Sequence, residues 1–112
     1  MTDKLFEPLQ LGGDSPITLK HRISLAPLTR QRADEPNMAP REMNIDYYRQ
    51  RASEGGLLIS EATNISAESC GYHHAPGIWS PEQVAGWKKV CDAVHEEGDF
   101  IFCQLWHIGR SQ

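Results

Sequence analysis

The sequence predicts an α/β fold built on a parallel sheet. Short apolar runs typical of buried strands alternate along the chain with segments whose apolar residues recur at helical spacing. The order strand, helix, strand, helix, strand predicts right-handed βαβ units, in which the strands run parallel. A doubly wound sheet and a barrel are both compatible with this order.

Two phosphate-binding signatures decide between those architectures. The turn after the first core strand lacks a GxGxxG motif, and no GxxxxGKS/T loop occurs in the sequence. These absences favour a partial TIM (β/α)8 barrel, represented by its first three βα units after an N-terminal β-hairpin. A closed barrel needs eight units and about 250 residues. We therefore interpret residues 1–112 as the incomplete N-terminal portion of a barrel domain.

The first part of the chain predicts a hairpin followed by a core strand. Leu9–Leu11 and Ile17–Leu19 are short runs of alternating apolar and polar residues on either side of turn-forming residues. Residues 23–26 are the first core strand, which Pro27 ends because proline has no N–H to donate to a sheet ladder. Residues 27–30 are therefore expected to form a turn at the carboxyl end of that strand.

The middle of the chain predicts one helix and a second strand. Residues 41–54 have helical character, and Gly55 with Gly56 ends the helix. Residues 57–60 are continuously apolar up to Ser60, which is typical of a parallel strand covered on both faces. The polar residues 61–64 are expected to form the turn after this strand.

The last third carries the clearest local signal. After a long loop over residues 66–80, Ser80 is a helix N-cap, Pro81 suits the first helical position and Gln83 completes a capping box. Gly98 ends this helix, and residues 100–103 are the third strand. Trp87 lies on the apolar face of the helix, and we interpret it as a packing residue.

Composition excludes several classes of partner. The net charge of −4 favours neither nucleic acid nor an anionic membrane surface. No apolar run approaches the roughly 20 residues that span a bilayer, and the N-terminal sequence lacks the pattern of a signal peptide. These features predict a cytoplasmic protein without a membrane partner.

Metal binding is not expected either. Cys70, Cys91 and Cys103 form no CxxC pair, and His73 with His74 has no third ligand at a recognisable spacing. We interpret Cys91 and Cys103 as small buried apolar residues.

Five motifs occur in one order along the chain: residues 25–30, 47–52, 59–63, 75–80 and 104–106. Through them the chain resembles the N-terminal part of the old yellow enzyme family, the FMN-dependent ene-reductases. The resemblance extends from about residue 5 to residue 110. Within the family, the sequence is similar in character to fungal and bacterial members, including enzymes of fungal specialised metabolism. It implies a (β/α)8 barrel closed below by the hairpin, with FMN across the carboxyl ends of the strands.

The resemblance also implies which residues contact ligands. Thr29 would bond the O4 side of the flavin, Ala62 would lie beneath the ring, and Gln104 would pair with the pyrimidine edge. Reduction places negative charge on these edges, which a hydroxyl and an amide donor would stabilise. The implied cofactor contacts are Pro27, Leu28, Thr29, Ala62 and Gln104, and the implied substrate contacts are Tyr72 and Trp106.

The function that the resemblance implies is NAD(P)H-dependent reduction of activated C=C bonds in small enone-type molecules. The family's proton donor, its substrate-carbonyl pair and its phosphate loops match no segment of residues 1–112, so no catalytic residue is assigned. Residues 1–112 expressed alone are expected to lack this activity and to be poorly soluble, because two sheet edges stay open. Two alternatives remain: a truncated, catalytically inert homologue, or a non-enzymatic interaction module that pairs with a complementing chain or a second copy.

Overall fold

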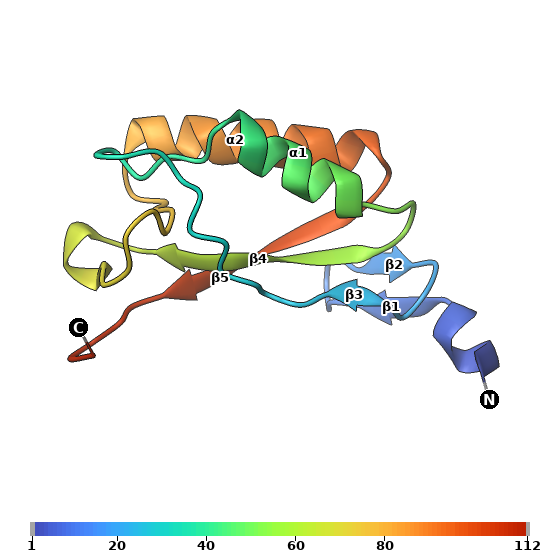
Figure 1. The fold of residues 1–112 in the computed structure, drawn as a ribbon. Coiled ribbons are helices and arrows are strands. Elements are labelled where there is room, and N and C mark those ends of the chain that lie inside the picture. Colours follow the sequence, from blue (N-terminus) through green and yellow to red (C-terminus); the bar gives the residue numbers. More distant parts are fainter. Residues whose placement is uncertain (1, 112) are drawn as a thin grey trace.

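The computed structural model describes residues 2–111 and contains two small sheets and two α-helices (Figure 1). Both α-helices lie over the same face of the larger sheet, and the small hairpin sheet lies beyond the amino ends of its strands (Figure 1). In chain order the elements are η1 (Thr2–Phe6), β1 (Leu9–Leu11), β2 (Ile17–Leu19), β3 (Ser24–Leu25), α1 (Glu42–Arg51), β4 (Leu57–Asn64), η2 (Ala67–Ser69), α2 (Pro81–Glu96) and β5 (Phe100–Trp106).

The pairing of the strands confirms the predicted topology. Strands β1 and β2 form the antiparallel hairpin, with Leu9 opposite Leu19. Strands β3, β4 and β5 are neighbours in that order, and both pairs are parallel. The α/β class and the order of the three core strands are therefore as predicted.

The prediction that residues 61–64 form a turn is wrong, because β4 continues to Asn64. Ala62, Thr63 and Asn64 pair with Gln104, Leu105 and Trp106 after an irregularity in the register that follows Ile59. This extension keeps the polar end of β4 inside the sheet, and it also makes β5 longer than the predicted residues 100–103.

Two other elements are shorter than predicted. Strand β3 covers two residues instead of residues 23–26, since the N–H of Ile23 donates to His21 Nδ1 at 3.3 Å and Pro27 has no N–H. Helix α1 ends at Arg51 instead of residue 54. It ends there because Ala52 is extended and the N–H of Ser53 donates to Asp99 Oδ2 at 2.8 Å.

Helix α2 begins as its sequence predicts. Ser80 Oγ accepts from the Gln83 N–H at 3.2 Å, and Gln83 Oε1 accepts from the Ser80 N–H at 3.0 Å. Pro81 occupies the first turn, and Gly98 follows the helix with φ +77°. This reciprocal capping satisfies two N–H groups that the first turn cannot satisfy itself.

The apolar core lies between the two helices and β4. Trp87 is buried in it, which confirms its interpretation as a packing residue, and its Nε1–H donates to the Gly77 carbonyl at 3.0 Å. The other face of the sheet carries no helix in Figure 1. The buried members of the core are Ile45, Tyr48, Leu58, Trp87, Val90, Ala93 and Val94.

Candidate functional site

The structure brings Thr29, Ala62 and Gln104 together at the carboxyl end of the three-stranded sheet. Thr29 follows the end of β3 by four residues, and its Oγ1 accepts a hydrogen bond from the Ala62 N–H at 3.3 Å. Ala62 in turn lies opposite Gln104 in the register between β4 and β5. Pro27 and Leu28 precede Thr29 in the same extended segment, with Pro27 half-buried and Leu28 exposed.

The hydrogen bonds already present decide what these side chains can offer a ligand. Because Thr29 Oγ1 accepts from a backbone N–H, the proton of its hydroxyl remains free to donate elsewhere. The backbone N–H of Gln104 donates to Ser60 Oγ at 3.0 Å, and this contact does not use the donor and the acceptor of the Gln104 side-chain amide. Ala62 contributes only a methyl group. A ligand edge with both N–H and C=O groups, such as the imide edge of a flavin, fits this set of donors and acceptors.

An aromatic pair lies near Gln104, at the end of β5. Tyr72, from the loop between β4 and α2, and Trp106 have ring centroids 5.4 Å apart with an interplanar angle of 37°. Tyr72 is half-exposed, and Trp106 is two residues beyond Gln104 on the same strand. The two residues expected on the substrate side are thus in contact with each other.

Sequence patterns missed a buried pair below this site, formed by Tyr48 of α1 and Glu61 of β4. The Tyr48 hydroxyl donates to Glu61 Oε1 at 3.3 Å and accepts from the Glu61 N–H at 2.8 Å. Glu61 Oε2 accepts from the Arg30 N–H at 3.1 Å. Both side chains are almost completely inaccessible to solvent, with exposures of 1% for Tyr48 and 0% for Glu61.

Burial dominates the acid–base properties of this pair. Desolvation raises the pKa of the Glu61 carboxyl, against the lowering effect of the hydrogen bonds from Arg30 and Tyr48. Desolvation also raises the pKa of the Tyr48 hydroxyl, with a further contribution from the Glu61 charge. The tyrosine is therefore neutral at any physiological pH and acts as a hydrogen-bonding group.

Glu61→Gln is expected to reduce the pH dependence of stability on the acid side. A folded-state pKa above the usual 4.5 means that protonation of Glu61 favours the folded state. This contribution is complete below the usual pKa and is lost as pH rises through the raised folded pKa. The unfolding free energy of the wild type minus that of E61Q should therefore fall over this window and then level off. Urea unfolding of both proteins from about pH 4 to about pH 8 tests this, and a difference independent of pH would contradict it.

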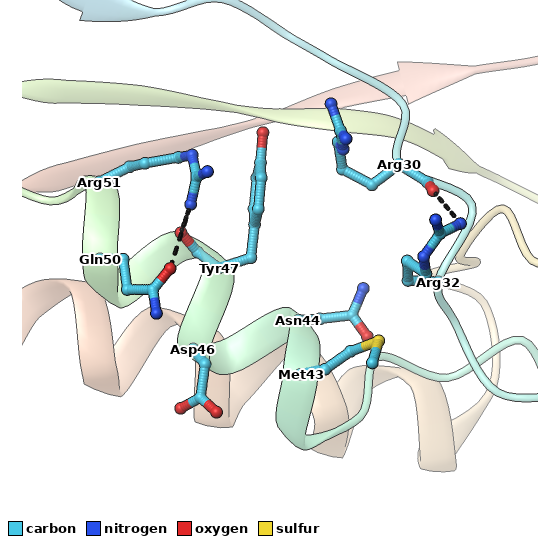
Figure 2. A pocket seen from close by; sticks show the side chains of 8 residues that line it. All are labelled: Arg30, Arg32, Met43, Asn44, Asp46, Tyr47, Gln50 and Arg51. Carbon is cyan, nitrogen blue, oxygen red and sulfur yellow. Dashed lines mark hydrogen bonds between the residues drawn. The ribbon is translucent and has the colours of Figure 1, made fainter.

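A pocket of about 300 Å³ opens between α1 and the segment after β3 (Figure 2). The Tyr47 ring stands between two guanidinium groups, with its centroid 3.9 Å from Arg51 Cζ and 5.6 Å from Arg30 Cζ. Such contacts stabilise a cation over an aromatic face. Arg30 thus contacts Tyr47 of α1 through its side chain and Glu61 of β4 through its backbone.

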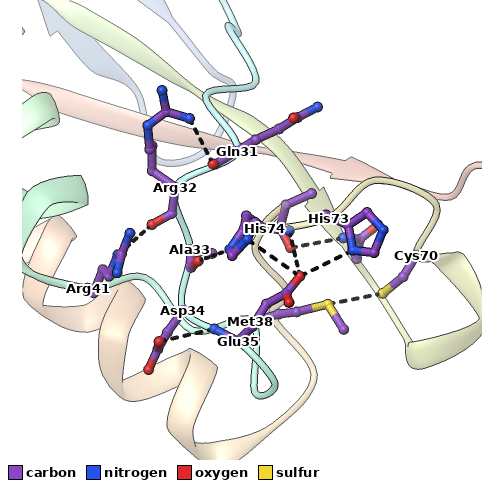
Figure 3. A network of polar contacts seen from close by, with 12 residues as sticks. Gln31, Arg32, Ala33, Asp34, Glu35, Met38, Arg41, Cys70, His73 and His74 are labelled. Carbon is purple, nitrogen blue, oxygen red and sulfur yellow. Dashed lines mark hydrogen bonds and ion pairs between the residues drawn. The ribbon is translucent and has the colours of Figure 1, made fainter.

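The two histidines connect loops, as Figure 3 shows. Glu35 Oε1 accepts from the backbone N–H of His74 at 3.2 Å and lies 3.5 Å from His73 Nδ1. His74 Nδ1 also lies 3.0 Å from the Ala33 carbonyl oxygen. These contacts join the β3–α1 loop to the loop that carries Tyr72. Within residues 2–111, no group of three or more His, Cys, Asp or Glu side chains is arranged to hold a metal ion.

The described part of the chain, residues 2–111, contains no helix with the length and apolar character needed to cross a membrane.

Comparison with known proteins finds fungal oxidoreductases that are similar to this chain over almost its whole length. The flavin oxidoreductase hxnT of Emericella nidulans is 47% identical over 112 residues, covering 97% of this chain. The NADP-dependent oxidoreductase lnbE of Aspergillus flavus is 55% identical over 111 residues, covering 98%. The chanoclavine-I aldehyde reductase fgaOx3 of Penicillium roqueforti is 52% identical over 108 residues, covering 96%. In each case the chain spans 28% of the relative's own length.

A family model gives the same assignment over almost the whole chain. The model described as the NADH:flavin oxidoreductase / NADH oxidase family matches residues 4–112. FMN, with NAD(P)H as the reductant, is the cofactor of this family. The chain therefore belongs to the NADH:flavin oxidoreductase / NADH oxidase family, the family of old yellow enzyme.

Proposed function

We propose that the protein is an FMN-dependent oxidoreductase of the old yellow enzyme type, which reduces activated C=C bonds with NAD(P)H. The observation that carries this proposal is the convergence of Thr29, Ala62 and Gln104 at the carboxyl end of a parallel sheet. Ligands bind at that end of the strands in barrels of parallel strands. We propose further that residues 1–112 are the N-terminal part of an FMN-binding (β/α)8 domain.

Each residue of the site has a role that its hydrogen bonds permit. The Thr29 hydroxyl donates to the O4 side of the flavin, and the Gln104 amide pairs with the pyrimidine edge. Ala62 lets the ring approach β4, and Pro27 with Leu28 contacts the ring from the segment before Thr29. FMN supplies the hydride chemistry when it is bound. The donors of this chain stabilise the negative charge that reduction places on the ring edge.

The aromatic pair favours a flat substrate. Tyr72 and Trp106, whose rings contact each other at the end of β5, offer an aromatic surface that suits a planar, conjugated enone. The three fungal relatives include a protein named as an aldehyde reductase, which supports a small carbonyl compound as the substrate class. A role in fungal specialised metabolism is part of the same proposal, and a cytoplasmic location stays a prediction.

The exposure of apolar residues in and beside the sheet supports the proposal of a barrel. Phe102 and Leu105 of β5 are 49% and 64% exposed, and Ile23 beside β3 is 52% exposed. Parallel sheets are normally covered on both faces, and their edge strands are paired or protected. We propose that further barrel units cover these residues. Coverage by a complementing chain or by a second copy is the alternative.

The protein expressed from its complete gene is the material that tests this proposal. It is expected to purify with FMN, to lose its visible absorption when NADPH is added without oxygen, and to regain it with 2-cyclohexenone. A protein that binds no added FMN would overturn the proposal and favour the inert homologue or the interaction module. Bound FMN that NADPH reduces but the enone does not reoxidise would overturn the substrate class.

A further inference from the structure

We infer that Glu61, held by the Tyr48 hydroxyl, is a positioning residue for the Thr29 hydroxyl. The inference rests on the proposed flavin site, because it concerns how that site is kept in shape. Glu61 does not reach the site itself: its side chain lies within the protein, against α1. Its effect passes through the segment after β3.

The pairing between β3 and β4 does not extend to Thr29, so other contacts must fix the position of this residue. The ladder between β3 and β4 consists of two pairs and ends at Leu25 opposite Leu58. Thr29 lies four residues further on, in a segment without regular secondary structure. Its position relative to β4 therefore depends on contacts other than the ladder.

Two adjacent contacts replace the ladder at this point. The carboxylate of Glu61 accepts from the Arg30 N–H at 3.1 Å, and the next residue, Ala62, donates its N–H to Thr29 Oγ1 at 3.3 Å. Neighbouring residues of β4 thus hold neighbouring residues of the segment. Loss of the Glu61 contact leaves this part of the segment with the Thr29–Ala62 hydrogen bond, which at 3.3 Å is the longer of the two.

Tyr48 makes the Glu61 side chain a fixed support. Its hydroxyl exchanges two hydrogen bonds with Glu61, one with the carboxylate and one with the backbone N–H. The Tyr48 ring packs edge-on against Tyr47 at 5.1 Å and lies 6.0 Å from the Trp87 ring. The support therefore extends from the core between the helices to the segment that carries Thr29.

A carboxylate suits this position because two separate donors meet it. Arg30 N–H reaches one oxygen and the Tyr48 hydroxyl reaches the other. A glutamine has the same shape but only one oxygen, so Glu61→Gln leaves one donor without its acceptor. The substitution disturbs the support without opening a cavity.

The Glu61 contact determines where the Thr29 hydroxyl can direct its proton. While Thr29 Oγ1 accepts from Ala62, its hydroxyl proton is available to a ligand. If the segment moves away, the hydroxyl can donate to other acceptors, and its contribution to ligand binding is lost. Glu61 then affects FMN binding only through Thr29, so removing either side chain's contact should weaken FMN binding by the same factor.

A double-mutant cycle on the protein from its complete gene tests this coupling. FMN dissociation constants are measured for the wild type, Thr29→Val, Glu61→Gln and the double variant. We expect each single variant to weaken FMN binding about tenfold, the effect of one lost hydrogen bond, and the double variant to be no weaker than T29V. A double variant whose loss of FMN affinity equals the product of the two single losses would overturn the inference.

Amide hydrogen exchange of the same proteins without FMN gives an independent readout. The segments containing Arg30 and Ala62 should exchange faster in E61Q and in Tyr48→Phe, and no faster in the matched control Glu96→Gln, at an exposed position of α2. Unchanged exchange in E61Q would overturn the inference even if FMN binds. Failure of the wild type to bind FMN would instead overturn the proposed function, and the exchange measurement would still decide the role of Glu61.

Discussion

Replacing Trp87 by alanine is expected to lower the free energy of unfolding by about 3–5 kcal/mol, the range for large aromatic residues in a core. Trp87 is 6% exposed and packs among core residues of both helices. The substitution also removes the indole N–H that donates to the Gly77 carbonyl, so a buried acceptor loses its partner. Urea unfolding of the protein from its complete gene, followed by circular dichroism, measures the change.

Val84→Ala is the matched control for this substitution. Val84 lies on the same helix with 51% of its surface exposed, so its truncation removes little buried area. We expect a change within about 0.5 kcal/mol. A Trp87→Ala effect as small as that of the control would show that α2 does not pack on the sheet as described.

Replacing Gln104 by leucine is expected to weaken FMN binding by about tenfold to a hundredfold. Leucine keeps the volume of the side chain but removes the donor and the acceptor, so the pyrimidine edge loses two hydrogen bonds of about 1 kcal/mol each. The backbone contact of residue 104 with Ser60 Oγ does not involve the side chain and should persist. Titration of the apoprotein with FMN, followed by flavin fluorescence, gives the dissociation constant.

Gln10→Leu makes the same chemical change away from the site. Gln10 is an exposed residue of β1, in the hairpin at the amino end of the sheet. This variant should bind FMN like the wild type. Equal effects of the two substitutions would mean that Gln104 has no specific contact with the flavin.

Local patterns were sufficient for much of the fold. Helix α2 begins at Pro81 because Ser80 and Gln83 satisfy each other's backbone groups, and this depends on residues close in sequence. The parallel order of the core strands follows from the alternation of apolar runs with helices. The side-by-side arrangement of Thr29, Ala62 and Gln104 follows from that order, since each comes late in, or just after, its strand.

The polar end of β4 shows what local patterns could not reveal. Asn64 is a typical turn residue and glutamate is uncommon in strands, yet Glu61 and Asn64 are both buried in β4. Asn64 Nδ2 donates to the Pro76 carbonyl at 3.1 Å, and Glu61 contacts Tyr48 and Arg30. These partners lie 12 to 31 residues away along the chain. No pattern within a window of a few residues identifies them, so the support beneath the site was visible only in the structure.

The proposed flavin site requires that Thr29 and Gln104 contact different parts of one flavin edge. NMR of bound FMN carrying ¹³C at C4 and ¹⁵N at N3 tests it most directly, in the wild type, T29V, Q104L and Q10L. We predict that T29V shifts mainly the C4 resonance and Q104L mainly the N3 resonance, with Q10L unchanged. Resonances of bound FMN that are the same in all four proteins would contradict the claim.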